Sequence, residues 1–159
     1  MQPPSRLSSF LPYQLSIASN AVSGRIAVEY RTRFGLSVPE WRVMAVLGDA
    51  GAMTQRDLTL RTLMDKVAVN RACKVLEERA LAARRPNNAD GRSHLLGLTA
   101  AGRAMHGQIM PLAIEMERRL FGDFSEQELG VFRPMLERLR ARVDGIYAED
   151  IAGSGFGIS

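Results

Sequence analysis

The chain of 159 residues has 46% hydrophobic and 24% charged residues, which argues against general disorder and suits one domain with a hydrophobic core. No run approaches the roughly 18–20 apolar residues of a membrane-spanning helix, and we read no secretion signal in the first residues. The single cysteine excludes an internal disulfide. We therefore expect a cytoplasmic protein with no membrane partner. The net charge of +4 lies in one segment, because residues 56–92 hold nine basic and five acidic residues while the remainder holds twelve of each.

Two helices with clear start signals are predicted first. Between residues 12 and 34, apolar side chains recur every three to four positions, which predicts an amphipathic helix. Ser37 and Glu40 have the spacing of a capping box, so a second helix should begin there. Gly48 and Gly51 are expected to bound the turn that follows.

Two shorter helices are expected next, over residues 55–63 and 66–79. Thr54 and Asp65 precede them, and both are residue types that cap a helix by accepting a hydrogen bond from its first turn. The connection between the two helices is short, as in a helix-turn-helix. In that motif the second helix enters the major groove of DNA and the first braces it across the backbone.

A small β-hairpin is predicted after these helices. Short runs at 81–85 and 94–98 flank the sequence RPNNADGR, in which Pro, Asn and Asp-Gly all favour a turn. The order of helices followed by a hairpin is that of a winged helix-turn-helix. The concentration of positive charge in this segment is typical of a surface that meets a polyanion, although a solvated basic face without a partner has the same composition.

Two long helices close the chain. Thr99 should cap a helix over residues 100–121, and Ser125 with Glu128 should open a last helix that ends near Val143. These helices and the first one offer an apolar surface suited to a two-fold dimer, unless they pack within one chain. Its residues are Leu11, Leu15, Ile17, Leu112, Ile114, Met116, Leu120, Phe121, Phe132, Met135, Leu136, Leu139 and Val143.

The predicted recognition helix, 66–79, has two unlike faces. Its inward stripe consists of Val69, Ala72, Cys73 and Leu76. Its outward side chains are Lys66, Val67, Ala68, Asn70, Arg71 and Lys74. Asn can pair bidentately with adenine, Arg can bind guanine or phosphate, and apolar residues can contact a thymine methyl. A helix face that is merely polar and exposed would have the same composition.

The hairpin tip supplies a second candidate contact. Arg84, Arg85 and Arg92 lie on or beside it, and an Arg on a protruding tip can enter a narrow minor groove. Asp90 is placed to hold the Arg92 guanidinium extended through a charge-assisted bond. The alternative is an ordinary Asp-Gly turn beside a surface arginine.

Residues 36–102 resemble the multiple-antibiotic-resistance regulator (MarR) family of bacterial transcription factors. The resemblance rests on LSVPEWRVMAVLGDAGAMTQRDL, MDKVAVNRACKVLEERALAARR and NNADGRSHLLGLTAAG, with an Asp-x-Arg wing and a Leu-Thr-x-x-Gly start of the next helix. The flanking long helices match the family's dimerisation elements more loosely, so the resemblance extends over about residues 10–145. Two departures are Val67 and Ala68, where many members have Ser or Thr, and Ala80, where many have Gly.

The resemblance implies a mainly α fold, a winged helix-turn-helix with long N- and C-terminal dimerisation helices. Residues 1–34 and 100–145 would dimerise, 35–99 would bind DNA, and 146–159 would form a flexible tail. It further implies a homodimer on a pseudo-palindromic double-stranded operator, usually as a repressor, with Arg92 in the minor groove braced by Asp90. The predicted DNA-contact set is Thr54, Gln55, Lys66, Val67, Ala68, Asn70, Arg71, Lys74, Arg84, Arg85, Asp90 and Arg92.

Resembling proteins often hold a small ligand between the dimerisation region and the DNA-binding lobe. A carboxylate could meet an arginine there and a ring could stack on aromatic side chains, so we hypothesise an aromatic acid or its thioester as effector. The candidate lining residues are Ser16, Asn20, Ser23, Tyr30, Arg31, Trp41 and Met44. Core packing is the competing interpretation for Trp41 and Met44.

Other classes of function find less support. No nucleophile, base and orienting group occur together at a recognisable spacing, so we predict neither an enzyme nor a cofactor. His94 and His106 are poor metal ligands by themselves, and no metal site is expected. Two alternatives stay open: a thiol-based redox sensor that acts through Cys73, and a non-specific architectural DNA-binding protein.

Overall fold

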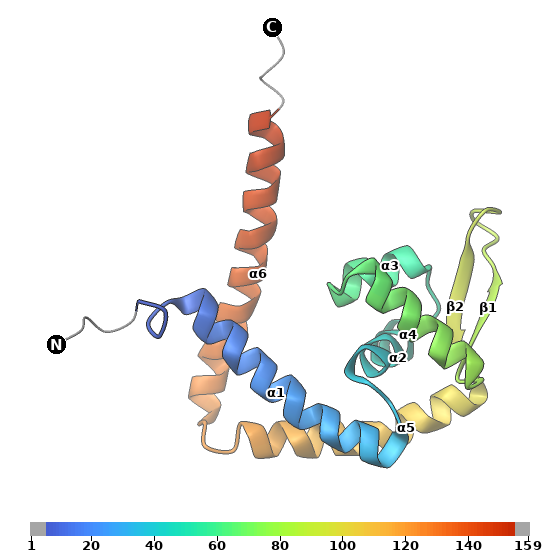
Figure 1. Ribbon diagram of the computed structural model, residues 1–159, viewed down its shortest axis with the longest axis horizontal. Helices are drawn as coiled ribbons and strands as arrows, with labels where there is room; N and C mark the ends of the chain where they lie inside the picture. The colour runs from blue at the N-terminus through green and yellow to red at the C-terminus, as the bar shows by residue number, and fades with distance from the viewer. Residues whose placement is uncertain (1–5, 155–159) are drawn as a thin grey trace, which may run out of the picture. The chain divides into compact units, whose positions relative to one another are not determined.

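The computed structural model describes residues 6–154, which form six helices and one two-stranded antiparallel sheet (Figure 1). This mainly helical architecture confirms the predicted fold class. The elements are α1 (Leu11–Phe34), α2 (Val38–Ala50), α3 (Gln55–Thr62), α4 (Lys66–Glu78), β1 (Ala82–Pro86), β2 (His94–Leu98), α5 (Ala100–Leu120) and α6 (Glu126–Ser154).

The helix ends follow the local chemistry of the sequence. Gly35 takes the left-handed conformation (φ 63°) and its amide donates to the carbonyls of Tyr30 and Arg31, which closes α1. The predicted capping box at the start of α2 is present: the Ser37 hydroxyl accepts from the Glu40 amide at 3.3 Å, and the Glu40 carboxylate accepts from the Ser37 amide at 2.9 Å.

Two predicted helix ends were wrong. Helix α2 continues through Gly48 to Ala50, and Gly51 alone ends it. A Cβ atom at Gly48 would lie 2.5 Å from Nε2 of His106, so this glycine serves the close packing of α2 against α5 rather than a turn. Helix α6 extends to Ser154, well beyond Val143, so the flexible tail expected from residue 146 is helical as far as 154. Residues 155–159 of that expected tail lie outside the described part of the chain.

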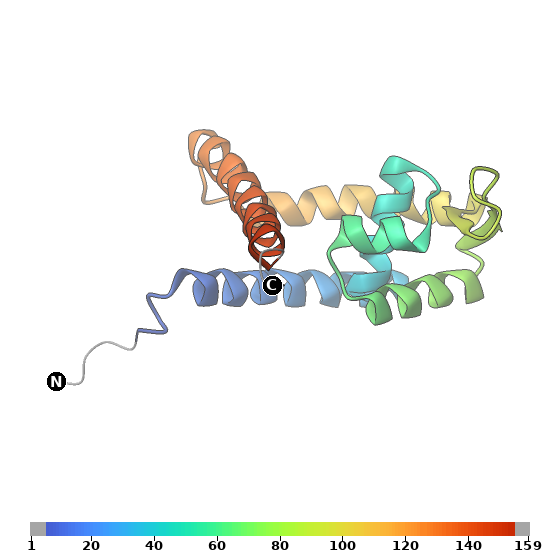
Figure 2. The same ribbon diagram turned by 90° about the horizontal axis from the view of Figure 1, so that it is seen from above.

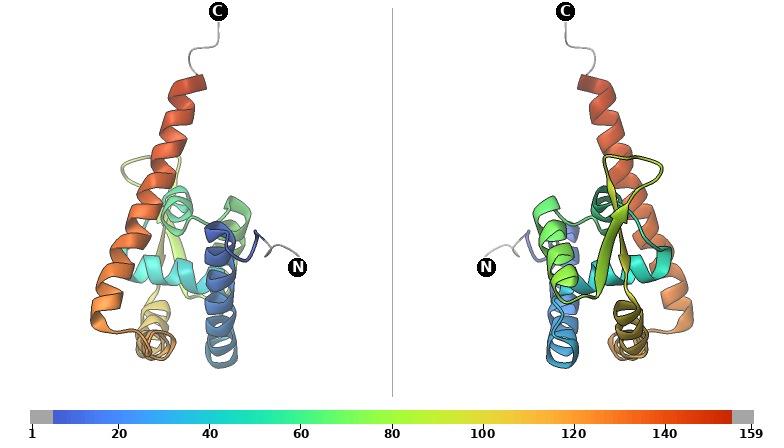
Figure 3. Two further views of the ribbon diagram at one scale, coloured as in Figure 1. Left: turned by 90° about the vertical axis from the view of Figure 1, so that its left-hand side faces the viewer. Right: turned by 90° about the vertical axis from the view of Figure 1, so that its right-hand side faces the viewer.

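The hairpin pairs its strands in the register Ala82↔Leu98 to Pro86↔His94. Met53 adds an antiparallel bridge to Leu96: the Met53 amide donates to the Leu96 carbonyl at 3.0 Å, and the Leu96 amide donates to the Met53 carbonyl at 2.8 Å. This bridge lies just before α3, so it fixes the hairpin against the helix-turn-helix. Figure 3 shows the two strands standing beside α4 with their loop projecting.

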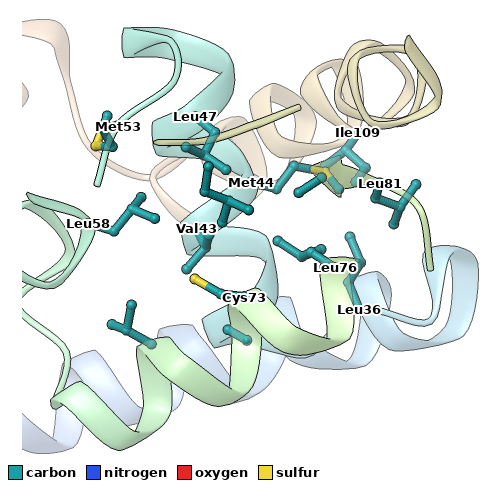
Figure 4. Packing of buried hydrophobic residues seen from close by; sticks show 14 of the residues in the cluster. Leu36, Val43, Met44, Leu47, Met53, Leu58, Cys73, Leu76, Leu81 and Ile109 are labelled. Atoms are coloured by element: carbon teal, nitrogen blue, oxygen red, sulfur yellow. The ribbon is translucent and has the colours of Figure 1, made fainter. Parts of the chain in front are cut away.

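The hydrophobic core is built around α2, which crosses between α1 and α5 (Figure 2). Val43 and Met44 of α2 are fully buried, and Leu58 of α3, Leu76 of α4 and Ile109 of α5 pack into the same cluster (Figure 4). Every helix of the predicted winged motif therefore contributes to one core, which holds the outward face of α4 in a fixed orientation.

The chain divides after Glu117 into two compact units. The second unit contains the end of α5 and all of α6. Its first turn is organised by Phe121, whose ring lies 5.8 Å from that of Phe124 and 6.3 Å from that of Phe132, and by the predicted capping box of Ser125 and Glu128. Within residues 6–154, no helix is long and apolar enough to cross a membrane.

Candidate nucleic-acid interface

Caps define both the start of α3 and the turn between α3 and α4. The Thr54 hydroxyl accepts from the Asp57 amide at 3.1 Å, and the Asp65 carboxylate accepts from the Ala68 amide at 2.8 Å. Leu63 ends α3 in the left-handed conformation with φ 52°. Thr54, a predicted DNA contact, thus uses its hydroxyl to start α3, and Asp65 fixes the first turn of α4.

Helix α4 has the two faces that the sequence predicts. Val69, Ala72, Cys73 and Leu76 are buried in the core. On the other side Lys66, Val67, Asn70, Arg71 and Lys74 are exposed, and Ala68 is half-buried. Within residues 6–154, Lys66, Arg71 and Lys74 have no carboxylate within ion-pair distance. The exposed face of α4 therefore carries three uncompensated cations and the apolar side chain of Val67, which is 64% exposed.

Four side chains link the wing to α4 through α3. Arg84 of β1 donates from Nε to the Glu77 carboxylate at 2.8 Å and from its terminal nitrogen to the Gln55 side-chain oxygen at 2.9 Å. Gln55 in turn donates from Nε2 to Oδ1 of Asn70 at 3.2 Å. We call Glu77, Arg84, Gln55 and Asn70 the wing relay. Three of the predicted DNA contacts, Gln55, Asn70 and Arg84, are thus bonded to one another.

The hairpin tip holds its shape through polar contacts of its own. Asn87 donates from its side chain to the Ser93 hydroxyl at 3.0 Å, and the Asp90 carboxylate accepts from the backbone amide of Arg92 at 3.1 Å. The expected bond from Asp90 to the Arg92 guanidinium was wrong, because this carboxylate shapes the turn instead. The guanidinium groups of Arg85 and Arg92 are exposed and, among the described residues, make no ion pair.

Two residues outside the predicted site, Glu77 and Arg79, hold this lobe together. Glu77 anchors Arg84, and Arg79 donates to the carbonyls of Phe34 at 3.0 Å and Gly35 at 3.1 Å. Arg79 thereby ties the end of α4 to the end of α1. Both contacts join separate elements, so no spacing along the chain reveals them.

The predicted effector residues occupy different environments. Tyr30 and Met44 are fully buried in the core. Trp41 is half-buried, with its ring 5.0 Å from that of Tyr30 and 6.0 Å from that of His106. Ser23 accepts from Arg42 at 3.4 Å. Ser16, Asn20 and Arg31 are exposed. Tyr30 and Met44 therefore serve core packing, while the other five keep accessible surface.

Neither a reactive thiol nor a group of metal ligands is found among the described residues. Cys73 lies in the core, and burial raises the pKa of its thiol to about 11. Because the thiolate is the reactive form, the buried thiol is a poor target for oxidants near neutral pH. Within residues 6–154, no three His, Cys, Asp or Glu side chains gather into a group that could hold a metal ion.

Known proteins similar to this chain are transcriptional regulators rather than enzymes. The model of the MarR family matches residues 34–93. An uncharacterized HTH-type transcriptional regulator of Bacillus subtilis, YdgJ, is 26% identical over 86% of this chain and 80% of its own length. An HTH-type transcriptional repressor of Mycobacterium tuberculosis is 26% identical over 66% of this chain and 76% of its own length.

Solved structures share the fold over most of the chain. A MarR/EmrR family regulator from Acinetobacter has a TM-score of 0.81 at 27% identity, over 87% of this chain and 98% of that one. Two more distant structures show the fold alone. One is a mutant MarR from E. coli in complex with operator DNA (TM-score 0.72, 20% identity, 81% of this chain and 92% of that one). The other is Bordetella bronchiseptica BpsR, whose DNA binding is regulated by 6-hydroxynicotinic acid (TM-score 0.68, 24% identity, 80% and 98%). Residues 34–93 thus match the MarR family, and over most of its length the chain is similar to transcriptional regulators with a DNA-binding winged helix-turn-helix fold.

Proposed function

We propose that this protein is a homodimeric repressor that binds a pseudo-palindromic operator, with α4 in the major groove and the hairpin tip in the minor groove. The observation that carries the proposal is the set of uncompensated cations on two elements of one lobe, Lys66, Arg71 and Lys74 on α4 and Arg85 and Arg92 on the hairpin. Cations without an internal partner are free to bind phosphates or base edges, and phosphate contacts release counterions on binding.

Exposed apolar side chains support the homodimer. In the first unit, Leu11, Leu15 and Ile17 are 76%, 43% and 50% exposed. In the second unit, α6 exposes Met135 and Leu139, and none of its residues is buried within the described chain. Apolar stripes of this length favour a partner surface, and a two-fold dimer supplies the same stripes from a second copy. Of the predicted dimer residues, Met116 is instead buried within its own chain.

A repressor is favoured over an activator because the mycobacterial relative is named a repressor. A two-fold dimer would place two copies of α4 about 34 Å apart, one turn of DNA, which matches a pseudo-palindrome. A non-specific architectural protein would also use cations, but it would gain little from an outward Asn and Val on a helix suited to the major groove.

The test of this proposal is the ratio of operator to random-DNA affinity. Operators are recovered from genomic fragments bound by the purified protein, and binding is then measured by fluorescence anisotropy. We expect operator binding about 10³-fold or more tighter than random-DNA binding. A ratio near one would favour the architectural alternative, and a monomer by light scattering would contradict the dimer.

Substitution of Arg92 tests the minor-groove contact. Arg92→Ala should weaken operator binding by about 1–3 kcal/mol, because an exposed guanidinium without an internal partner is lost while the turn bonds of Asp90 and Ser93 remain. Arg140→Ala on α6 is the control and should leave affinity nearly unchanged. Unchanged operator affinity of a folded Arg92→Ala dimer would contradict the wing contact.

Response to an aromatic acid or its thioester is the second part of the proposal. The DNA binding of the Bordetella protein is regulated by 6-hydroxynicotinic acid, which is an aromatic acid. In the present chain Arg31 is exposed and Trp41 keeps accessible surface, so a carboxylate and a ring have partners on α1 and α2. Calorimetric titration with a panel of aromatic acids tests this, and the absence of heat with every member counts against it.

A further inference from the structure

The charged pair of Glu77 and Arg84 fixes which group donates and which accepts in each hydrogen bond of the wing relay. Glu77 can only accept hydrogen bonds as a carboxylate, and the Arg84 guanidinium can only donate. Arg84 therefore donates to Glu77 at 2.8 Å and, with its terminal nitrogen, to the side-chain oxygen of Gln55 at 2.9 Å. The ion pair is only partly exposed, with side-chain accessibilities of 36% for Arg84 and 30% for Glu77.

The same reasoning fixes the orientation of the side-chain amides of Gln55 and Asn70. Because the oxygen of Gln55 faces a group that only donates, the nitrogen Nε2 is the end that faces α4. Nε2 donates to Oδ1 of Asn70 at 3.2 Å. Asn70 consequently turns its oxygen toward the protein, and its nitrogen Nδ2 makes no hydrogen bond to any described residue. The exposed end of Asn70 is a donor with two hydrogens.

We propose that the wing relay makes Asn70 a hydrogen-bond donor that reads guanine in the major groove. Guanine presents two adjacent acceptors there, O6 and N7, so Nδ2 can donate to either one, whereas adenine places its N6 amino group, a donor, beside N7. The familiar Asn–adenine pair needs an outward acceptor as well as a donor, and the relay has turned that acceptor toward Gln55. Asn70 is the contact residue, while Gln55 and Arg84 act as positioning residues. The inference rests on the proposed operator binding.

One nearly isosteric substitution reverses the direction of the relay. In Gln55→Glu the introduced carboxylate still accepts from Arg84, but it cannot donate to Asn70. The Asn70 amide then gains by rotating, so that Nδ2 donates to the carboxylate and Oδ1 faces outward as an acceptor. We expect selection from a random-sequence DNA pool to move the base preference at one position of each half-site. The expected shift is at least about tenfold, from guanine to adenine or cytosine, the bases with an exposed major-groove donor.

Arg56→Gln is the matched control. Arg56 is the exposed neighbour of Gln55 and lies outside the relay, so its loss should weaken binding across sequences without moving any base preference. Gln55→Glu adds a negative charge that also weakens binding overall, which is why the ratio of affinities for two bases is the quantity measured. Adenine selected by the wild-type protein, or guanine retained by Gln55→Glu, overturns the proposal.

A measurement without DNA separates this inference from the proposed function. In nuclear magnetic resonance spectra of the free full-length protein, the side-chain NH₂ signal of Asn70 should shift in Gln55→Glu, because its hydrogens then donate to a carboxylate, and stay unchanged in Arg56→Gln. An unchanged Asn70 signal in Gln55→Glu overturns the relay even if the protein selects operators. A shifted signal in a protein that selects no sequence refutes the proposed operator binding, and the guanine assignment with it.

Discussion

Helices α4 and α6 are both amphipathic, yet they relate to their own chain in opposite ways. Helix α4 buries Val69 and Leu76 completely and turns cations outward. Helix α6 is more than twice as long, but none of its residues is buried within the described chain. The DNA-binding lobe is therefore stabilised by its own core, whereas the apolar side of α6 stays exposed. Substitutions in α4 should therefore lower the stability of the lobe, whereas substitutions in α6 should weaken the association of two chains.

The largest effect is expected from a cavity beneath α4. Leu76 of α4 is fully buried in the core cluster, so Leu76→Ala should lower the free energy of unfolding by about 3–5 kcal/mol. Denaturant unfolding followed by circular dichroism measures it. Leu136→Ala on α6, where the side chain is 39% exposed in the single chain, should cost far less at a protein concentration too low for dimerisation. Equal losses at both positions would contradict the contrast between the helices.

The next effect is expected on the dimer. Leu139 is 46% exposed on α6, and Leu139→Glu would place a charge in the proposed interface. The charge loses its hydration there, so we expect at least tenfold weaker association, or about 1.4 kcal/mol. Sedimentation over a range of concentrations measures the association. Arg140→Glu is the adjacent control with a larger charge change. A Leu139→Glu protein that still dimerises tightly would place the interface elsewhere.

Ionisation of the buried Cys73 thiol should make the stability of the DNA-binding lobe fall at alkaline pH. Burial raises the pKa of its thiol from 9.0 to about 11, so the folded protein holds this proton more tightly than the unfolded chain. The resulting stability is complete below pH 9 and is lost as the pH rises toward 11, by roughly 2 kcal/mol. Unfolding measured at several pH values should show this slope, and Cys73→Ala should reduce it. Burial also raises the pKa of Tyr30, so part of the slope should remain.

The sequence predicts what depends on local chemistry. The capping boxes at Ser37 and Ser125, the two-faced α4 and the hairpin strands are local features, because spacing along the chain determines them. The turn predicted at Gly48 was wrong, because the role of this glycine depends on His106 in a helix far along the chain. The end of α6 was misjudged because its apolar spacing continues through Ile146 and Ile151.

The candidate site shows the same division between local and long-range effects. The sequence identifies which side chains of α4 and the hairpin face outward, because periodicity and turn chemistry decide exposure. It does not identify what Arg84 binds, since Glu77 and Gln55 approach it from two other elements. For Asp90 both a backbone amide and a guanidinium are within reach along the chain, and the turn geometry decides for the amide.

The smallest effect concerns Ala80, which follows the C-cap of α4 and precedes the hairpin. Ala80 has φ 55°, a left-handed conformation that costs an L-residue with a Cβ about 1–2 kcal/mol and glycine almost nothing. Glycine also makes the unfolded chain more flexible, which removes part of the gain. Ala80→Gly should therefore raise the free energy of unfolding by about 0.5–1 kcal/mol. Ala104→Gly, an exposed site inside α5, is the same chemical change at an ordinary helical position and should lower it by about 1 kcal/mol. Denaturant unfolding of the two variants gives opposite signs if backbone strain is stored at Ala80, and the same sign if that residue is relaxed.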